Sequence, residues 1–201
     1  MKFLVISDIH GDSAIALRAA ERSEKEKVDA VIIAGDITNY NMEFENIIKP
    51  FKEKGKQVMI IPGNHESIDS INLIAQYYGI KNIHGCPVKF GDIGIVGIGG
   101  ATTGPFYRIT ESRISELLKK GFDDIKDCKK KLLITHIHPK NTLMEKLSNL
   151  VSGSKALTEG LYKYKPNFLL CGHIHEASGL EEKIGDTTAI NVSRKEKIIE
   201  L

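Results

Sequence analysis

Short apolar runs alternate with longer amphipathic stretches along the first third of the chain. The apolar runs cover residues 3–6, 28–34 and 57–61 and have the composition of strands buried on both faces. The stretches between them predict helices from Asp12 or Ser13 to about residue 27, over 42–54 before Gly55, and over 67–78 before Gly79. This strand–helix alternation predicts a parallel sheet.

The pattern changes in the later part of the chain. Residues 88–90 and 93–98 predict a β-hairpin, 131–135 and 168–171 predict buried strands, and 178–201 predict hairpin strands that turn at Gly185 and Asp186. Helices are expected over 112–120 and 154–163. Because early strands are parallel and later ones antiparallel, we expect an α/β fold of two mixed β-sheets packed face to face with helices outside. A length of 201 residues suits one domain over 1–201.

Five short polar segments each begin where an apolar strand ends. They are Asp8-Ile9-His10, Gly35-Asp36, Gly63-Asn64-His65-Glu66, Thr135-His136 and Gly172-His173-Ile174-His175. Because open α/β sheets bind ligands at the carboxyl ends of their strands, we expect these loops to converge. Mixed oxygen and imidazole donors favour Mn, Fe or Zn over Mg or Ca. The donors exceed one tetrahedral site and suit two ions that share a carboxylate.

The charge balance of such a site indicates its chemistry. Two divalent ions bring four positive charges, of which Asp8 and Asp36 cancel two. The remaining charge matches a hydroxide and a phosphate group. A two-metal clamp stabilises the attacking and leaving oxygens of an in-line displacement and lowers the pKa of bound water. The sequence therefore predicts a phosphoric-ester hydrolase in which a metal-bridging hydroxide attacks.

The ordered set DxH, GD, GNH, TH and GHxH, from Asp8 to His175, resembles the calcineurin-like metallophosphoesterases. The resemblance implies a four-layer α/β/β/α sandwich. It implies that the first ion is held by Asp8, His10, Asp36 and His175, and the second by Asp36, Asn64, His136 and His173. It also implies that Asp36 and His65 are catalytic, that Asn64 and His65 contact the phosphate, and that His65 protonates the leaving group.

Within the family, residues 35–38, 64–66, 153–155 and 172–176 are similar to the predicted phosphoesterases related to the Icc cyclic-nucleotide phosphodiesterase. The phosphoprotein phosphatases read GDxxDRG, but Asn39 and Tyr40 occupy the second Asp and the Arg positions here. No arginine flanks a motif, and a diester carries one charge less than a monoester. We therefore expect a phosphodiester substrate, with nucleotides and cyclic nucleotides as candidates. A phosphomonoesterase acting on a small substrate and a non-catalytic metal-binding scaffold are the alternatives.

Residues beyond these motifs have two interpretations each. His138 stands in the first proline position of a THxPP pattern and is either a substrate contact or an exposed loop histidine. Residues 153–155 open a helix, for which simple capping is preferred over anion binding. Glu66 and Glu176 are either partners of the histidine ligands or solvated charges. We interpret His84 and Asn191 as structural.

Composition limits the partners. With 28 basic and 26 acidic side chains, the net charge of +2 gives no reason to expect nucleic acid or an anionic membrane. We find neither an apolar run near the roughly 20 residues of a membrane span nor a signal-peptide pattern. Cys86, Cys128 and Cys171 are expected to be reduced thiols, which favours the cytoplasm. Mn is the favoured metal, with Fe, Zn and Ni as alternatives, and oligomeric state has no signal in the sequence.

Overall fold

The computed structural model describes residues 1–39, 44–148 and 151–201, and the strands in these ranges form two mixed sheets. The first sheet has the order β11-β1-β2-β3-β4, with β1 (Lys2–Ile6), β2 (Ala30–Ala34), β3 (Gln57–Ile61), β4 (Lys81–Asn82) and β11 (Lys197–Glu200). The second has the order β5-β6-β7-β8-β10-β9, with β5 (Val88–Phe90), β6 (Ile93–Ile98), β7 (Lys130–Thr135), β8 (Phe168–Cys171), β9 (Glu181–Ile184) and β10 (Thr187–Asn191).

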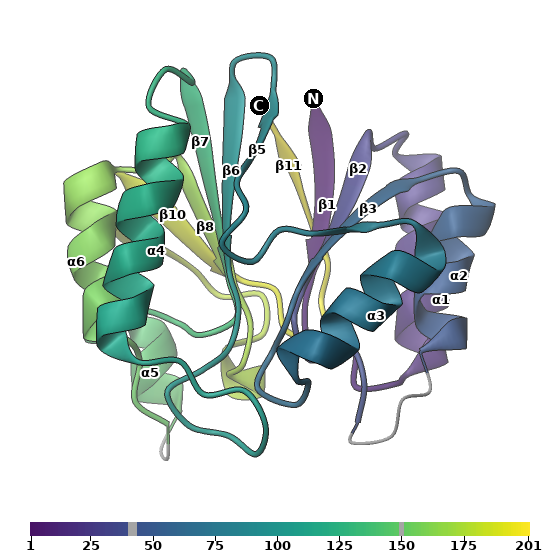
Figure 1. Cartoon of the computed structure of the whole chain (residues 1–201), viewed down its shortest axis with the longest axis horizontal. Coiled ribbons are helices and arrows are strands. Elements are labelled where there is room, and N and C mark those ends of the chain that lie inside the picture. The colour runs from purple at the N-terminus through teal and green to yellow at the C-terminus, as the bar shows by residue number, and fades with distance from the viewer. Residues whose placement is uncertain (40–43, 149–150) are drawn as a thin grey trace.

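The helices cover the outer faces of the two sheets, so the described chain has four layers (Figure 1). The first sheet is covered by α1 (Ser13–Lys25), α2 (Glu45–Glu53) and α3 (Ile68–Tyr78), and the second by α4 (Glu111–Asp124) and α6 (Lys155–Tyr164). The short helix α5 (Leu143–Leu147) lies at one end of the second sheet. The predicted α/β/β/α sandwich is confirmed.

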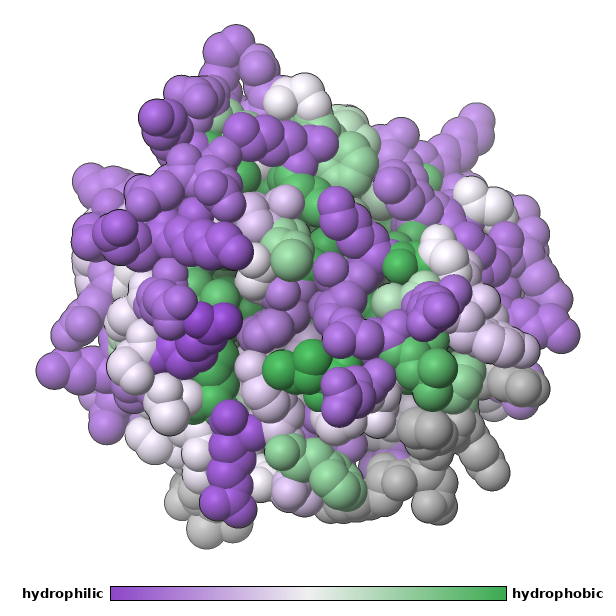
Figure 2. Space-filling view, viewed as in Figure 1, coloured by the Kyte–Doolittle hydropathy of each residue, from purple (hydrophilic) through white to green (hydrophobic). Residues whose placement is uncertain are grey.

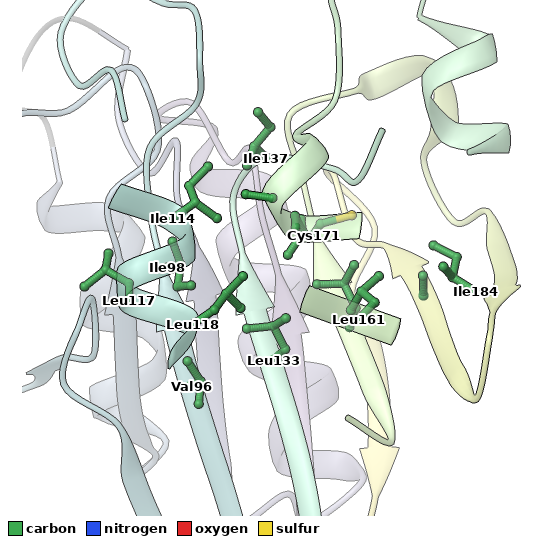
Figure 3. Close-up of a cluster of buried hydrophobic side chains, with 14 of the residues drawn as sticks. Val96, Ile98, Ile114, Leu117, Leu118, Leu133, Ile137, Leu161, Cys171 and Ile184 are labelled. Atoms are coloured by element: carbon green, nitrogen blue, oxygen red, sulfur yellow. The ribbon is translucent and has the colours of Figure 1, made fainter. Parts of the chain in front are cut away.

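The strands have apolar side chains on both faces because both faces are covered. In β1, Phe3 and Val5 belong to the cluster between the two sheets, whereas Leu4 and Ile6 pack with the helices of the first sheet. A third cluster lies between the second sheet and its helices, where Leu118 and Leu161 meet Leu133 (Figure 3). The continuous apolar runs in the sequence follow from this double burial.

The chain ends depart most from the prediction. The hairpin β9–β10 turns at residues 185–186 as predicted, but β11 leaves the second sheet and pairs antiparallel with β1, with Lys2 opposite Glu200. Because Ile199 is buried in the cluster between the sheets, this crossing adds apolar contact that a local hairpin would not.

Element bounds differ where burial extends past the predicted end. The helix predicted over 112–120 runs to Asp124 because Gly121 and Phe122 are also buried against the second sheet. The predicted start of the second helix at residue 42 lies outside the described residues, and the helix is present from Glu45 onward. Neither β4 nor α5 was predicted, since each is too short to show a period.

The described surface is mostly polar, with small separate apolar patches on the face that Figure 2 shows. Among the described residues, no helix combines the length and the apolar character needed to cross a bilayer. All three cysteines are free thiols, as expected.

Candidate metal centre

The five polar segments lie together at the carboxyl ends of β1, β2, β3, β7 and β8, in the lower part of Figure 1. Backbone hydrogen bonds join the loops within a sheet, as between the Asp8 N–H and the Gly35 carbonyl at 3.0 Å. A side chain joins the two sheets, since Nδ1 of His136 lies 2.9 Å from the Ala34 carbonyl oxygen. The predicted convergence of these loops is therefore present in the fold.

The backbone of these loops adopts a conformation that side chains disfavour. Eight non-glycine residues in the described ranges have positive φ, and half of them are predicted ligands. These are Asp8 (56°), His10 (50°), Asp36 (49°) and His173 (73°). Strained backbone of this kind costs roughly 1–3 kcal/mol per residue and persists where surrounding contacts enforce it, which is typical of functional sites.

Glycines allow the loops to approach one another this closely. A Cβ on Gly63 would lie 2.7 Å from Cγ of Asp36 and closer still to its Oδ1. A Cβ on Gly172 would lie 2.7 Å from Cβ of Ser7 and would also meet the Asp8 carboxylate. The glycines of the GNH and GHxH segments are therefore required by the packing of the acidic loops against them.

Asp8, His10 and His175 form one cluster with ligand atoms within 4.8 Å of one another. Nε2 of His175 lies 3.3 Å from Oδ1 of Asp8, and Nε2 of His10 lies 3.8 Å from the same oxygen. Nδ1 of His10 bonds Oδ1 of Asn39 at 3.0 Å, which fixes the ring with Nε2 turned toward the carboxylates.

A second cluster contains Asp36, His136 and His173, again within 4.8 Å. Oδ2 of Asp36 lies 3.4 Å from Nε2 of His136 in this cluster and 3.6 Å from Nε2 of His10 in the first. Oδ1 of Asn64 lies 3.0 Å from Nε2 of His136, so the amide also faces the second cluster. Asp36 lies between the two clusters, where a shared ligand must be.

Burial and the charges of their neighbours shift the pKa values of the two carboxylates and of His136. Burial raises the pKa of Asp8, but the hydrogen bond with His175 and the charge of His136 outweigh it, so the pKa lies below its ordinary value. Burial likewise raises the pKa of Asp36, and His136 more than offsets it. Burial lowers the pKa of His136, but the Asp36 carboxylate raises it to about 10. The metal-free site thus holds a proton among its carboxylates, where a cation would replace it.

The donor set fits divalent transition-metal ions. Burial, and then the charge of His136, lower the pKa of His173 to about 3, so its ring is neutral. Its buried Nε2 has no hydrogen-bond partner within the described part of the chain. A buried imidazole lone pair beside a carboxylate costs free energy unless it binds a proton or a metal ion. The two clusters are therefore candidate sites for two ions.

His65 lies beside both clusters and belongs to neither. Its backbone N–H donates to Oδ1 of Asp36 at 2.9 Å, and its Nε2 lies 3.8 Å from Oδ2 of the same residue. Its ring packs edge-on to that of His10, with the centroids 5.0 Å apart. The side chain is 19% exposed, so it is accessible from the cavity that it lines.

A cavity of about 630 Å³ opens over the clusters. Its lining includes the apolar side chains of Leu147, Val151 and Ile174 and the polar side chains of Asn39 and Arg194. A smaller cavity of about 140 Å³ shares His65 with it.

The smaller cavity is lined by Phe106 and Ile74 together with Thr38, Ser67 and Ser70. The backbone N–H of Phe106 donates to the Asn64 carbonyl oxygen at 3.1 Å, which holds the loop after β6 against the site. His65 therefore lies between two cavities of different size and lining.

Three other predicted residues lie away from the cavity or on its rim. His138 is fully buried behind His173 and does not line the cavity, and neither of its ring nitrogens has a hydrogen-bond partner among the described residues. Its contact with substrate stays a prediction that requires the ring to be uncovered. Glu176 is exposed on the cavity rim. Ser154 caps α6, and the Glu111 carboxylate accepts from the N–H groups of Lys155 and Ala156, so this helix end is already satisfied.

Glu66 bonds the backbone of two loops rather than a histidine. Its buried carboxylate accepts from the N–H groups of Asp36 (3.1 Å), Thr38 (2.9 Å) and Gly63 (2.9 Å). Burial, and then the Asp36 charge, raise its pKa to about 7, while the donors from Thr38 and Gly63 oppose that rise. The residue ties the loops after β2 and β3 together.

Two residues near the end of the chain also organise the site. The side-chain amide of Asn191 donates to the Ile174 carbonyl oxygen at 3.0 Å and so supports the loop that carries His173 and His175. Arg194 reaches the cavity although it lies in no motif. The pairing of β10 with β8 places Asn191 opposite Cys171, and the crossing from β10 to β11 places Arg194. Only the strand-end position of Asn191 was visible in the sequence.

Comparisons with known proteins agree with this geometry. The family model described as calcineurin-like phosphoesterase matches residues 1–177. An uncharacterised protein of Methanocaldococcus jannaschii is 31% identical over 202 residues, which cover 97% of this chain and 89% of that protein.

Solved structures share the fold at low identity. A protein from Thermus thermophilus aligns with a TM-score of 0.76 and 15% identity, covering 96% of this chain and 90% of that chain. A dimetal phosphatase from Danio rerio aligns with a TM-score of 0.63 and 12% identity, covering 95% of this chain and 86% of that chain. An archaeal phosphodiesterase aligns with a TM-score of 0.52 and 17% identity, covering 95% of this chain and 82% of that chain. Because a phosphatase and a phosphodiesterase share this architecture, the fold alone does not decide between them.

Proposed function

The chain belongs to the calcineurin-like phosphoesterase family, and on that premise we propose that it hydrolyses a phosphodiester at a pair of divalent transition-metal ions. The observation that carries the proposal is the position of Asp36, whose Oδ2 lies between the two clusters. Asp8, His10, Asp36 and His175 would hold one ion, and Asp36, Asn64, His136 and His173 the other. When bound, such a pair supplies Lewis acidity to the phosphoryl oxygens and a nucleophile from water of lowered pKa.

The side chains of this protein have separate tasks in the proposed reaction. Asn64 and His65 contact the phosphoryl group, since both line the cavity beside Asp36. His65 donates a proton to the departing oxygen, because it lies next to the clusters and is accessible from both cavities. Asp36 positions His65 through the hydrogen bond from the His65 backbone N–H.

Two cavities that meet at His65 favour a diester over a monoester. A diester carries two organic substituents, and each cavity has room and apolar wall for one of them. Ile74 and Phe106 line the smaller cavity, beside the proton donor, where a leaving group with an apolar part would lie. Nucleotide-containing diesters, including cyclic nucleotides, are candidates of suitable size for the larger cavity.

A phosphomonoesterase is the alternative, and one residue favours it. The sequence argument for a diester depends on the absence of arginine beside the motifs, yet Arg194 lines the larger cavity. A guanidinium in that position offsets the extra charge of a monoester. We further propose Mn as the resident metal, a cytoplasmic location and one domain over residues 1–201.

Turnover of paired chromogenic substrates tests the proposal. The protein loaded with Mn is assayed with bis(p-nitrophenyl) phosphate and with p-nitrophenyl phosphate, and we expect the higher kcat/KM for the diester. A higher value for the monoester would support the alternative. Hydrolysis of neither ester, nor of cyclic nucleotides, by protein that binds its metal fully would support a non-catalytic scaffold instead.

A further inference from the structure

Arg194 is the one permanent cation among the described residues that line the larger cavity. It lines the same cavity as His175, a residue of the first cluster. Glu176 lines the same cavity, so the charged side chains in its lining are of both signs. A single fixed cation at an otherwise mixed rim indicates a specific contact.

The backbone of Arg194 is fixed in a conformation that a side chain rarely adopts. Its φ is 56°, its N–H donates to the Ser7 carbonyl oxygen at 2.8 Å, and its own carbonyl accepts from Arg18 at 3.1 Å. Ser7 directly precedes Asp8, so these bonds tie Arg194 to the first cluster. A strained residue held by its neighbours in this way is typical of a functional position.

Asp12 orients the guanidinium. Its Oδ2 accepts from Nη2 of Arg194 at 3.1 Å, while its Oδ1 caps α1 by accepting from Ala14 and Ile15 at 3.0 and 3.2 Å. The helix therefore fixes the carboxylate, and the carboxylate fixes the arginine. Within the described part of the chain, this bond uses one of the five N–H donors of the guanidinium. The side chain is 42% exposed, so its other donors are accessible.

We propose that Arg194 binds an oxyanion of the substrate at the His175 side of the cavity, and that Asp12 is its positioning residue. The inference depends on the proposed function only in that the anion belongs to a phosphoric ester. The oxyanion is either an oxygen of the scissile phosphoryl group or a second anionic group of the same substrate. In both cases Arg194 raises affinity for substrates with more negative charge, and so sets specificity.

Anion binding to the Mn-loaded protein tests this without turnover. Calorimetry gives the dissociation constants of inorganic phosphate and of phosphoglycolate, which carries a carboxylate besides its phosphoryl group. Because hydrogen bonds to charged groups contribute about 1.5–3 kcal/mol, R194Q should weaken binding about 10- to 100-fold at unchanged metal content. The matched control is R113Q, since Arg113 is 49% exposed and paired with Glu116 on α4, and it should bind both anions as the parent does.

Asp12→Asn tests the positioning role. Asparagine caps helices as well as aspartate, so α1 should persist, but the charge that orients Arg194 is lost. We expect weaker anion binding than in the parent, with the loss smaller than in R194Q. Binding equal to that of the parent would overturn the role of Asp12.

The outcomes separate the two claims. Loss of affinity for both anions in R194Q assigns Arg194 to the phosphoryl group, and loss for phosphoglycolate alone assigns it to a second anion. Unchanged affinity for both, or no binding of either anion by the parent, overturns the inference. If the parent binds anions through Arg194 but hydrolyses no ester, the proposed function fails and this inference stands. If the parent hydrolyses esters and R194Q binds anions normally, the inference fails and the proposed function stands.

Discussion

Replacing Gly63 by alanine puts a methyl group against the Asp36 carboxylate. The new Cβ would lie 2.7 Å from Cγ of Asp36, which is 0.7 Å short of an ordinary 3.4 Å contact, and closer still to Oδ1 and the backbone nitrogen. Oδ1 also accepts the N–H of His65, so the carboxylate has no room to move without disturbing that residue. We therefore expect the loops after β2 and β3 to separate.

The size of the effect follows from these distances. A displacement of about 1 Å in a reacting group costs roughly 100-fold in rate, so kcat/KM of Gly63→Ala should fall by about that factor. Overpacking costs about 1–3 kcal/mol of stability, which for a chain of this size lowers Tm by roughly 2–12 °C. Because Asp36 is the proposed shared ligand, metal content at limiting Mn should fall as well.

The assay compares this variant with one at another crowded glycine, remote from the site. A Cβ on Gly94, in β6, would lie 2.6 Å from Cβ of Ile125, at the end of the strand far from the site. Gly94→Ala should therefore lose stability but keep its metal content and its activity per folded molecule. The reasoning is refuted if Gly63→Ala binds two equivalents of Mn and keeps kcat/KM within about threefold of the parent.

Three further predictions concern the site itself. Asp36→Asn should abolish hydrolysis almost completely and lower metal stoichiometry, whereas Asp186→Asn, in the exposed β9–β10 turn, should leave both unchanged. Equal activity of the two variants in the same assay would show that Asp36 is not the shared metal ligand. His65→Asn should keep both metals but slow hydrolysis by about 10²–10⁴-fold for alkyl esters and much less for nitrophenyl esters, and a rate loss independent of leaving-group pKa would exclude the acid role. Metal affinity should rise with pH, because the pKa of His136 is raised to about 10 and its proton must leave before a metal ion binds. The same proton stabilises the metal-free fold fully below about pH 6.5, and this stabilisation is lost as pH rises through about 10. Titration calorimetry in two buffers should detect this proton release, and pH-independent affinity would contradict it.

The two candidate metal-ligand clusters could be predicted from the sequence because each of their residues is local to a strand end. Asp8, Asp36 and His136 each stand two positions after the last residue of an apolar run, and the double burial of these runs makes them easy to recognise. Parallel strands bring such positions to one edge of a sheet. Two face-to-face sheets with helices outside followed from the strand pattern, and the family resemblance implied the four-layer sandwich. A pattern of this kind needs no knowledge of distant contacts.

The remaining features depend on contacts between distant parts of the chain. Arg194 reaches the cavity because β11 crosses to pair with β1, and the bond to Asp12 spans 182 positions. The role of Glu66 depends on three N–H groups from two loops, which sequence position alone does not reveal. The burial of His138 behind His173 likewise depends on the packing of two separate loops.

A crystal structure of the Mn-loaded protein, with the ions located by their anomalous scattering, tests the central claim most directly. The account predicts two ions per chain about 3.5–4 Å apart, both bound to the Asp36 carboxylate. Asp8, His10 and His175 should surround one ion, and Asn64, His136 and His173 the other. A single ion under saturating Mn, or two ions that share no carboxylate of Asp36, would contradict it.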